Sequence, residues 1–192
     1  MSTFEKIISH FNLQLDAISG SIEGMTAPTA EAAELITNGF IEGHKVICCT
    51  SANAIPAGRE FCQQLLFSPR IDRPGLPAIF LEHQTTLPNH FPDEIFSKQV
   101  IALGEEGDIL LLFSGSGNEK YLSSTIDAAT FRKMKVVLCS AGKSTDLTDK
   151  MPPDGIAISL QQLPDHVAQL LQFMLGQLLP ELIETQLFGI ST

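Results

Sequence analysis

The stretch of sequence that decides the fold is residues 109–139, ILLLFSGSGNEKYLSSTIDAATFRKMKVVLC. It begins and ends with short aliphatic runs, 109–113 and 136–139, of the kind that form buried strands. Between them, residues 118–132 place apolar side chains at helical spacing, after a loop rich in glycine and serine. Two strands joined through a helix require a crossover connection, which makes them parallel. The stretch therefore predicts one strand–helix–strand unit of an α/β fold.

The same alternation of apolar runs and helical stretches extends along most of the chain. Further strands are predicted at 46–49, 78–81 and 156–158, and further helices at 54–66 and 93–103. Strands that alternate with helices form a parallel sheet covered by helices on both faces. We therefore expect a three-layer α/β/α sandwich with a five-stranded parallel sheet, as in flavodoxin-like folds.

Helices are also expected at both ends of the chain. Residues 3–19 carry an apolar stripe, and a second helix is predicted at 29–41, after Pro28, so that the two form an N-terminal helical hairpin. The last helix, 164–187, is apolar around most of its circumference. Such a helix needs burial on more than one side, so we expect it at a subunit interface. The alternative is that it runs through the core of the monomer.

Length and charge narrow the possible classes of protein. A chain of 192 residues suits one domain, 1–192, made of N-terminal helices (1–43), an α/β core (44–160) and a C-terminal oligomerisation helix with its tail (161–192). Twelve Lys and Arg residues stand against 22 Asp and Glu residues, for a net charge of −10. Nucleic-acid binding depends on clustered cations, so direct binding to DNA or RNA is not expected.

Membrane, secreted and metal-binding classes are not favoured either. No uninterrupted apolar run reaches the roughly 18 residues of a membrane span, and the N-terminus has no secretory signal pattern. Adjacent Cys48 and Cys49 would point to opposite faces of a strand, a poor arrangement for a disulfide or a metal site. The five histidines show no metal-ligand spacing. We expect a reduced, cytoplasmic protein with no membrane contact, metal or cofactor.

Two loops are candidates for a binding site. Residues 50–54 follow the first strand and residues 114–119 follow the third, and in parallel sheets ligands bind beyond the carboxyl ends of strands. The second loop, Ser-Gly-Ser-Gly-Asn-Glu, has flexible glycines, hydroxyl donors and a following helix N-terminus, which together can cradle an anion. The alternative is an ordinary strand-to-helix turn.

At this loop the sequence resembles a known family. Residues 107–118, GDILLLFSGSGN, are similar to the "GDVLL-x-x-STSGNS" signature of sugar isomerase (SIS) domains of the phosphoheptose isomerase group. Residues 43–49 resemble the first strand of that group, and 73–79 its "RP-x-x-PAI" segment. The resemblance implies the SIS fold, a phosphosugar site and aldose–ketose isomerisation.

The binding loops depart from the family pattern. The family's "CGNGGS" loop is CTSANA here, and Glu119 replaces the family's last serine, a phosphate donor. A carboxylate about 5 Å from a phosphate costs several kcal/mol, and Glu119 is placed to satisfy the following helix N-terminus itself. The resemblance therefore implies a degenerate phosphosugar site, with a phosphosugar as its possible ligand. Its residues would be Ser51, Asn53, Ser114, Ser116, Asn118 and Glu119.

The catalytic groups of the family are also replaced. Its glutamate lies in "HFAEEL", which matches EFCQQL here, so the acid becomes Gln63 or Gln64. Aligned by its C-terminal end, the last helix has Gln177 where the isomerases have a histidine. An amide cannot exchange protons near neutral pH, so no catalytic residue is expected. Glu60, one helical turn from the lost acid, is the one group that could leave residual isomerase activity.

One branch of the family fits these losses. Residues 182–188, LIETQLF, resemble the "LIDNTLF" end of the DnaA initiator-associating members, which are non-catalytic tetramers. The resemblance implies a homotetrameric scaffold whose Leu187 and Phe188 contact the replication initiator DnaA, while the alternative is that the pair packs against a neighbouring subunit. Two other functions stay open: a sugar-phosphate isomerase and a degenerate phosphosugar sensor.

Overall fold

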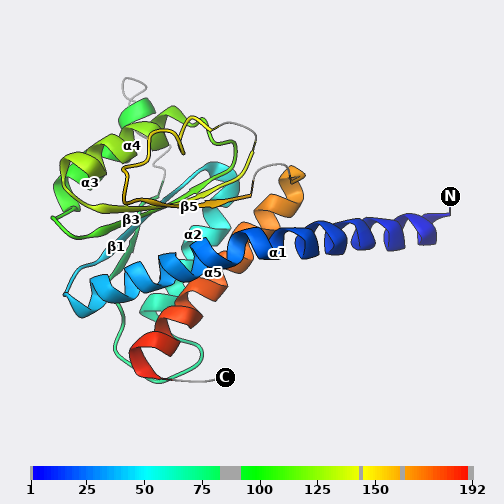
Figure 1. Ribbon diagram of the computed structural model, residues 1–192, viewed down its shortest axis with the longest axis horizontal. Helices are drawn as coiled ribbons and strands as arrows, with labels where there is room; N and C mark the ends of the chain where they lie inside the picture. The colour runs from blue at the N-terminus through cyan, green and yellow to red at the C-terminus, as the bar shows by residue number, and fades with distance from the viewer. Residues whose placement is uncertain (1, 83–91, 143–144, 161–162, 190–192) are drawn as a thin grey trace.

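A five-stranded parallel sheet forms the centre of the molecule. The computed structural model describes residues 2–82, 92–142, 145–160 and 163–189 (Figure 1). The sheet has the order β2-β1-β3-β4-β5, and every neighbouring pair is parallel. The strands are β1 (Val46–Thr50), β2 (Ala78–Phe80), β3 (Ile109–Ser114), β4 (Lys135–Ser140) and β5 (Ile156–Ser159). The five predicted strands are confirmed.

Helices cover both faces of this sheet. In Figure 1, α1, α2 and α5 lie on one face, and α3 and α4 lie on the other. The helices are α1 (Thr3–Ile41), α2 (Ile55–Leu66), α3 (Ser97–Leu103), α4 (Lys120–Phe131) and α5 (Asp165–Phe188), with short 3-10 turns at Ala52–Ala54 and Pro92–Glu94. The three-layer α/β/α sandwich is confirmed.

The central strands explain why the sheet forms where the sequence predicts it. All residues of β1 and β3 are buried, and successive side chains alternate between the two cores. Cys48 and Leu111 pack toward α2 and α5, whereas Cys49 and Leu112 pack toward α3 and α4. A strand that is buried on both faces needs apolar residues at consecutive positions, which is the pattern of these runs.

The predicted N-terminal helical hairpin is wrong. A single helix, α1, runs through Pro28 without interruption and replaces the two helices expected on either side of it. Proline leaves the carbonyl four residues earlier without its amide partner. Here that carbonyl belongs to Gly24, which is exposed, so water can donate to it. Thr29, the residue after Pro28, is buried, and from there the second half of the helix packs against the rest of the molecule.

The first half of α1 extends beyond the rest of the molecule (Figure 1). The second half packs against α5 and β5. Helices α5 and α2 approach closely, because a Cβ built on Gly176 would lie 2.5 Å from the carbonyl oxygen of Ala57. No helix in the described part of the chain is long and apolar enough to cross a membrane.

Candidate functional site

The two predicted loops meet at the carboxyl edge of the sheet and line one cavity of about 580 Å³. Four of the six predicted ligand residues lie on its wall: Ser51, Asn53, Ser116 and Glu119. The other two do not line the cavity but hold the loop. Ser114 is fully buried and accepts a hydrogen bond from the Gly117 amide (2.8 Å), and Asn118 accepts one from the Ser116 hydroxyl (2.8 Å). The wall also includes Ala52, Gly115, Tyr121, Gly142 and Asp165.

The Glu119 carboxylate is held by the donors of the Gly/Ser loop. Its Oε1 accepts hydrogen bonds from the amides of Gly115 (3.0 Å) and Ser116 (2.9 Å). Its Oε2 accepts one from the Ser114 hydroxyl (2.6 Å). These backbone amides converge as they would around a bound anion, and a glutamate of the chain itself supplies the negative charge.

The bonds to Glu119 correct one expectation. The sequence places Glu119 to satisfy the N-terminus of the following helix, but in the described chain its carboxylate binds back to the loop and makes no capping bond to α4. Burial alone would raise the pKa of Glu119, but hydrogen bonds from the Ser114 hydroxyl, its own amide and Ser116 outweigh burial and lower it. The carboxylate is therefore ionised at neutral pH.

Two buried polar atoms beside the cavity lack a hydrogen-bond partner among the described residues. They are Oγ of Ser51, a residue 4% exposed, and Oε1 of Gln172, a residue 0% exposed. The Gln172 amide nitrogen donates to the carbonyl oxygens of Ser114 (2.7 Å) and Cys139 (3.3 Å), at the ends of β3 and β4. The sequence analysis missed Gln172; an amide inside an otherwise apolar stretch of the last helix was the available signal.

The positions of the lost isomerase groups come together between α2 and α5. Gln64 donates to Oε1 of Glu60 at 2.6 Å, and Gln177 lies 3.3 Å from the same oxygen. Gln63 is exposed on another side of α2. Gln64, and not Gln63, therefore shares the Glu60 carboxylate with Gln177. A carboxylate, that of Glu60, therefore lies between the two amides.

This cluster continues into a buried ion pair that the sequence analysis missed. Arg70 donates to Gln64 (2.8 Å) and to Glu184 (2.8 Å), and Arg73 donates to Glu184 at 2.6 and 2.9 Å. The side chains of Arg73 and Glu184 are each 3% exposed. Burial would raise the pKa of Glu184, but hydrogen bonds from Ser68 and the two arginines lower it. The cluster ties the end of α2 to the end of α5.

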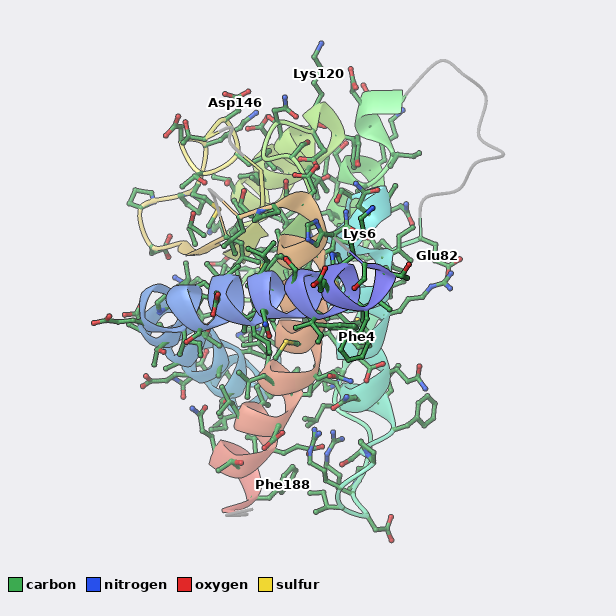
Figure 2. All side chains as sticks on the ribbon, turned by 90° about the vertical axis from the view of Figure 1, so that its right-hand side faces the viewer. Phe4, Lys6, Glu82, Lys120, Asp146 and Phe188 are labelled. Carbon is green, nitrogen blue, oxygen red and sulfur yellow. The ribbon has the colours of Figure 1, made fainter. Side chains whose placement is uncertain are left out.

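The predicted partner-binding pair lies at the end of α5. Leu187 is half-buried against the core, and Phe188 is 45% exposed. The helix then ends at Gly189, whose φ of 69° is the left-handed conformation that glycine favours. Figure 2 shows Phe188 and Lys120, the residue after Glu119, at opposite ends of the molecule. The two predicted sites are therefore separate surfaces.

Metal-ligating side chains and cysteine thiols are two further kinds of group in the described residues that bear on catalysis. No three His, Cys, Asp or Glu side chains among them are grouped to hold a metal ion. The four cysteines are free and buried. Burial raises the pKa of Cys139 to about 12 and the pKa values of Cys48 and Cys49 well above their ordinary range, so these thiols are poor nucleophiles at neutral pH.

Comparison with known proteins agrees with the fold and the loop signature. A family description for the SIS domain matches residues 10–140. A phosphoheptose isomerase of Chromohalobacter salexigens is 30% identical over 189 residues, which cover 96% of each chain. A phosphoheptose isomerase of Pseudoalteromonas atlantica is 31% identical over 159 residues, 80% of this chain and 81% of the relative.

Solved structures give the same result. A phosphoheptose isomerase from Francisella tularensis superposes with a TM-score of 0.90 at 28% identity, over 96% of this chain and 100% of the other. A glucosamine-fructose-6-phosphate aminotransferase domain from the same species shares only the fold, with a TM-score of 0.59 at 13% identity, over 95% of this chain and 46% of the other. The chain belongs to the SIS-domain family, in the group that contains the phosphoheptose isomerases.

Proposed function

We propose that this chain is a non-catalytic SIS-domain scaffold that assembles into a homotetramer and holds a protein partner, the replication initiator DnaA. The observation that carries the proposal is the Glu119 carboxylate in the anion-binding loop, with hydrogen bonds of 2.6 to 3.0 Å from three loop donors. A phosphosugar would need the same donors for its phosphate. Repulsion between a carboxylate and a phosphate at this range costs several kcal/mol, enough to remove useful affinity.

The loss of proton-transfer groups supports the same proposal. Isomerisation of an aldose to a ketose requires groups that take up and release a proton near neutral pH. Gln64 and Gln177 are amides that hydrogen-bond to Glu60, and neither lines the cavity. The α2–α5 cluster then acts as a structural connection rather than as an acid–base pair.

Assembly is supported by the apolar surface of α1 and α5. The projecting half of α1 exposes a stripe of large side chains: Phe4 (73%), Ile8 (46%), Phe11 (60%), Leu15 (62%) and Ile22 (54%). The stripe continues into an apolar groove of about 390 Å³ between α1 and α5, lined by residues such as Ile18, Met174 and Leu178. Exposed apolar surface of this extent is typical of subunit interfaces. A second copy of the chain is the partner that this surface fits, and two such contacts per chain would build a tetramer.

The end of α5 is the surface proposed for the initiator. Phe188 is an exposed aromatic residue on the last helical turn, and aromatic residues of this kind anchor protein interfaces. The resemblance of residues 182–188 to the DnaA initiator-associating branch names the partner. A tetramer would present four such ends, and multivalent binding raises the effective concentration of each contact.

Capture of the initiator tests the proposal. Purified full-length chain, immobilised at equal load, is expected to retain DnaA, and the double variant Leu187→Ala/Phe188→Ala is expected to lose at least tenfold in retained DnaA. Phe131→Ala is the matched control, because Phe131 is an exposed phenylalanine (76%) at the end of another helix, α4. Undiminished capture by the double variant, or equal loss in the control, would remove the proposed contact.

A sugar-phosphate isomerase is the second candidate, favoured by one observation. The Glu60 carboxylate lies between Gln64 and Gln177, where it can still act as a base, and the relatives in this group are named phosphoheptose isomerases. This candidate predicts turnover of a heptose phosphate that disappears in Glu60→Gln. Absence of turnover by the wild-type chain at high protein concentration would eliminate it.

A further inference from the structure

The cavity at the sheet edge keeps room for a ligand although its anion position is filled. Its volume of about 580 Å³ lies within the range of small-molecule sites. The Glu119 carboxylate occupies the loop donors at one end, so the remaining space corresponds to the rest of a ligand and not to its phosphate.

One buried hydroxyl on this wall has an unused hydrogen-bonding capacity. Ser51 is 4% exposed, lines the cavity, and has no partner for its Oγ among the described residues. A buried polar atom without a partner costs free energy, so native structures seldom keep one without a reason. A ligand hydroxyl in the cavity would supply the missing bond.

The remaining groups of the wall are those that recognise a sugar. Asn53 offers an amide, and the Ser116 hydroxyl, which donates to Asn118, can still accept a hydrogen bond. Burial and then the negative charge of Glu119 raise the pKa of Tyr121 to about 12, so its phenol keeps its proton. Polar groups of these kinds, beside an aromatic ring, bind ring hydroxyls and a sugar face.

The charge of the wall selects against phosphate. Glu119 and Asp165 both line the cavity, and none of its described lining residues is a lysine or an arginine. Two carboxylates repel a dianionic phosphosugar and attract a cationic group. The same geometry that excludes a phosphomonoester therefore tolerates a neutral sugar and favours one that carries an ammonium group.

We propose that this cavity binds an unphosphorylated sugar, with an amino sugar preferred over its neutral counterpart, and that the Glu119 carboxylate takes the place of the ligand's phosphate. Ser51 is the residue assigned to a ligand hydroxyl. This inference goes beyond the scaffold function, since it concerns a surface at the other end of the molecule from Phe188 (Figure 2).

Matched sugars with and without phosphate test the charge argument. The probes are D-glucosamine, D-glucose and their 6-phosphates, titrated into the full-length chain by calorimetry and by melting temperature, which a ligand raises when it binds the native state. We expect D-glucosamine to bind at least tenfold more tightly than D-glucosamine 6-phosphate, and more tightly than D-glucose. Glu119→Ser frees the loop donors for a phosphate. In this variant each 6-phosphate should bind more tightly than the corresponding free sugar.

A second variant tests Ser51 separately. Ser51→Ala removes an atom that has no partner in the described chain, so the fold should persist, as circular dichroism would check. We expect it to weaken D-glucosamine binding at least tenfold. Ser123→Ala, a serine on α4 that does not line the cavity, is the control and should bind as the wild type does.

Three results would overturn the inference. They are binding of the 6-phosphates by the wild type as tightly as the free sugars, absence of binding by both free sugars, and equal affinity of Ser51→Ala and Ser123→Ala. None of these bears on capture of the initiator by the end of α5, so failure here is distinguishable from failure of the scaffold proposal.

Discussion

The polar interior of the site and the apolar surface of α1 differ in where their interactions are made. At the cavity and between α2 and α5, buried or half-buried carboxylates are held by donors of the chain itself, as Glu119 and Glu184 illustrate. On the projecting half of α1, by contrast, large apolar side chains such as Phe4 and Phe11 are 60 to 73% exposed in the monomer. The two carboxylates are therefore already satisfied within the chain, whereas the apolar side chains of this half of α1 are left for contacts with another molecule.

The largest effect is expected from a charge placed in the apolar stripe of α1. Phe11→Glu places a carboxylate in the proposed interface, and an interface that packs the same patch of two copies together would bury two of them. At about 3 kcal/mol for each unpaired buried charge, the cost is about 6 kcal/mol, or roughly a 10⁴-fold weaker association. Sedimentation velocity at micromolar concentration is expected to show species smaller than the tetramer.

The control for this variant lies on the same helix. Leu13 is 67% exposed, similar to Phe11, but it lies off the stripe. Leu13→Glu should leave the assembly intact. Dissociation by both variants, or by neither, would contradict the assignment of the stripe to a contact between copies.

A variant of the buried ion pair tests the polar region between α2 and α5. Glu184→Ala leaves Arg73 buried without its carboxylate, and loss of one partner of a buried pair costs about 3–5 kcal/mol of unfolding free energy. Arg59 and Glu82 form an ion pair of the same 2.6 Å length, but both side chains are about 60% exposed. Glu82→Ala should therefore cost less than about 1 kcal/mol in the same urea titration. Similar losses in the two variants would show that the α2–α5 cluster does not hold the helices together.

A smaller effect is expected at Glu119. Glu119→Gln loses charge-assisted hydrogen bonds from the loop, so the free energy of unfolding at pH 7 should fall by about 1.5–3 kcal/mol. The pKa of Glu119 is lowered in the folded state, so its contribution is complete above the unfolded value of about 4.3 and is lost as the pH falls through the folded pKa. Urea titrations should thus give a constant difference between wild type and variant from pH 7 to 5, shrinking toward pH 3. A difference that grows on acidification would contradict the assignment.

The smallest effect is expected at the end of α5. Phe188→Ala should change the unfolding free energy by less than about 1 kcal/mol, because the ring is 45% exposed on the last helical turn. Leu187→Ala should cost about 1–2 kcal/mol, because Leu187 packs against the core. A larger loss for Phe188→Ala than for Leu187→Ala in thermal unfolding would mean that the aromatic ring is a structural residue.

The strands could be predicted from the sequence to within one residue at each end, because a parallel strand buried on both faces needs consecutive apolar residues. The position of α1 could not. Pro28 is an ordinary signal for a break between helices, and only the exposure of Gly24 and the burial of Thr29 explain why the helix continues. Local patterns describe what a segment prefers, and tertiary packing decides whether that preference holds.

The candidate site could be predicted in composition but not in its bonding. The loop signature located Ser114, Ser116 and Glu119, and the family pattern pointed to Gln64 and Gln177. The direction of the Glu119 carboxylate depends on loop geometry, which residue types do not determine. The ion pair of Arg73 with Glu184 joins residues 111 positions apart, so no local sequence pattern predicts it.

The pKa of Glu119 tests most directly whether its carboxylate fills the anion position. A pH titration of the side-chain carboxyl carbon by NMR, with the resonance identified by its loss in Glu119→Gln, would measure it in the native chain. A carboxylate held by the loop donors should titrate below the usual value of about 4.3 for a glutamate. A value at or above 4.3 would contradict the account, because it would mean that the carboxylate is turned away from the amides and the loop is open to a phosphate.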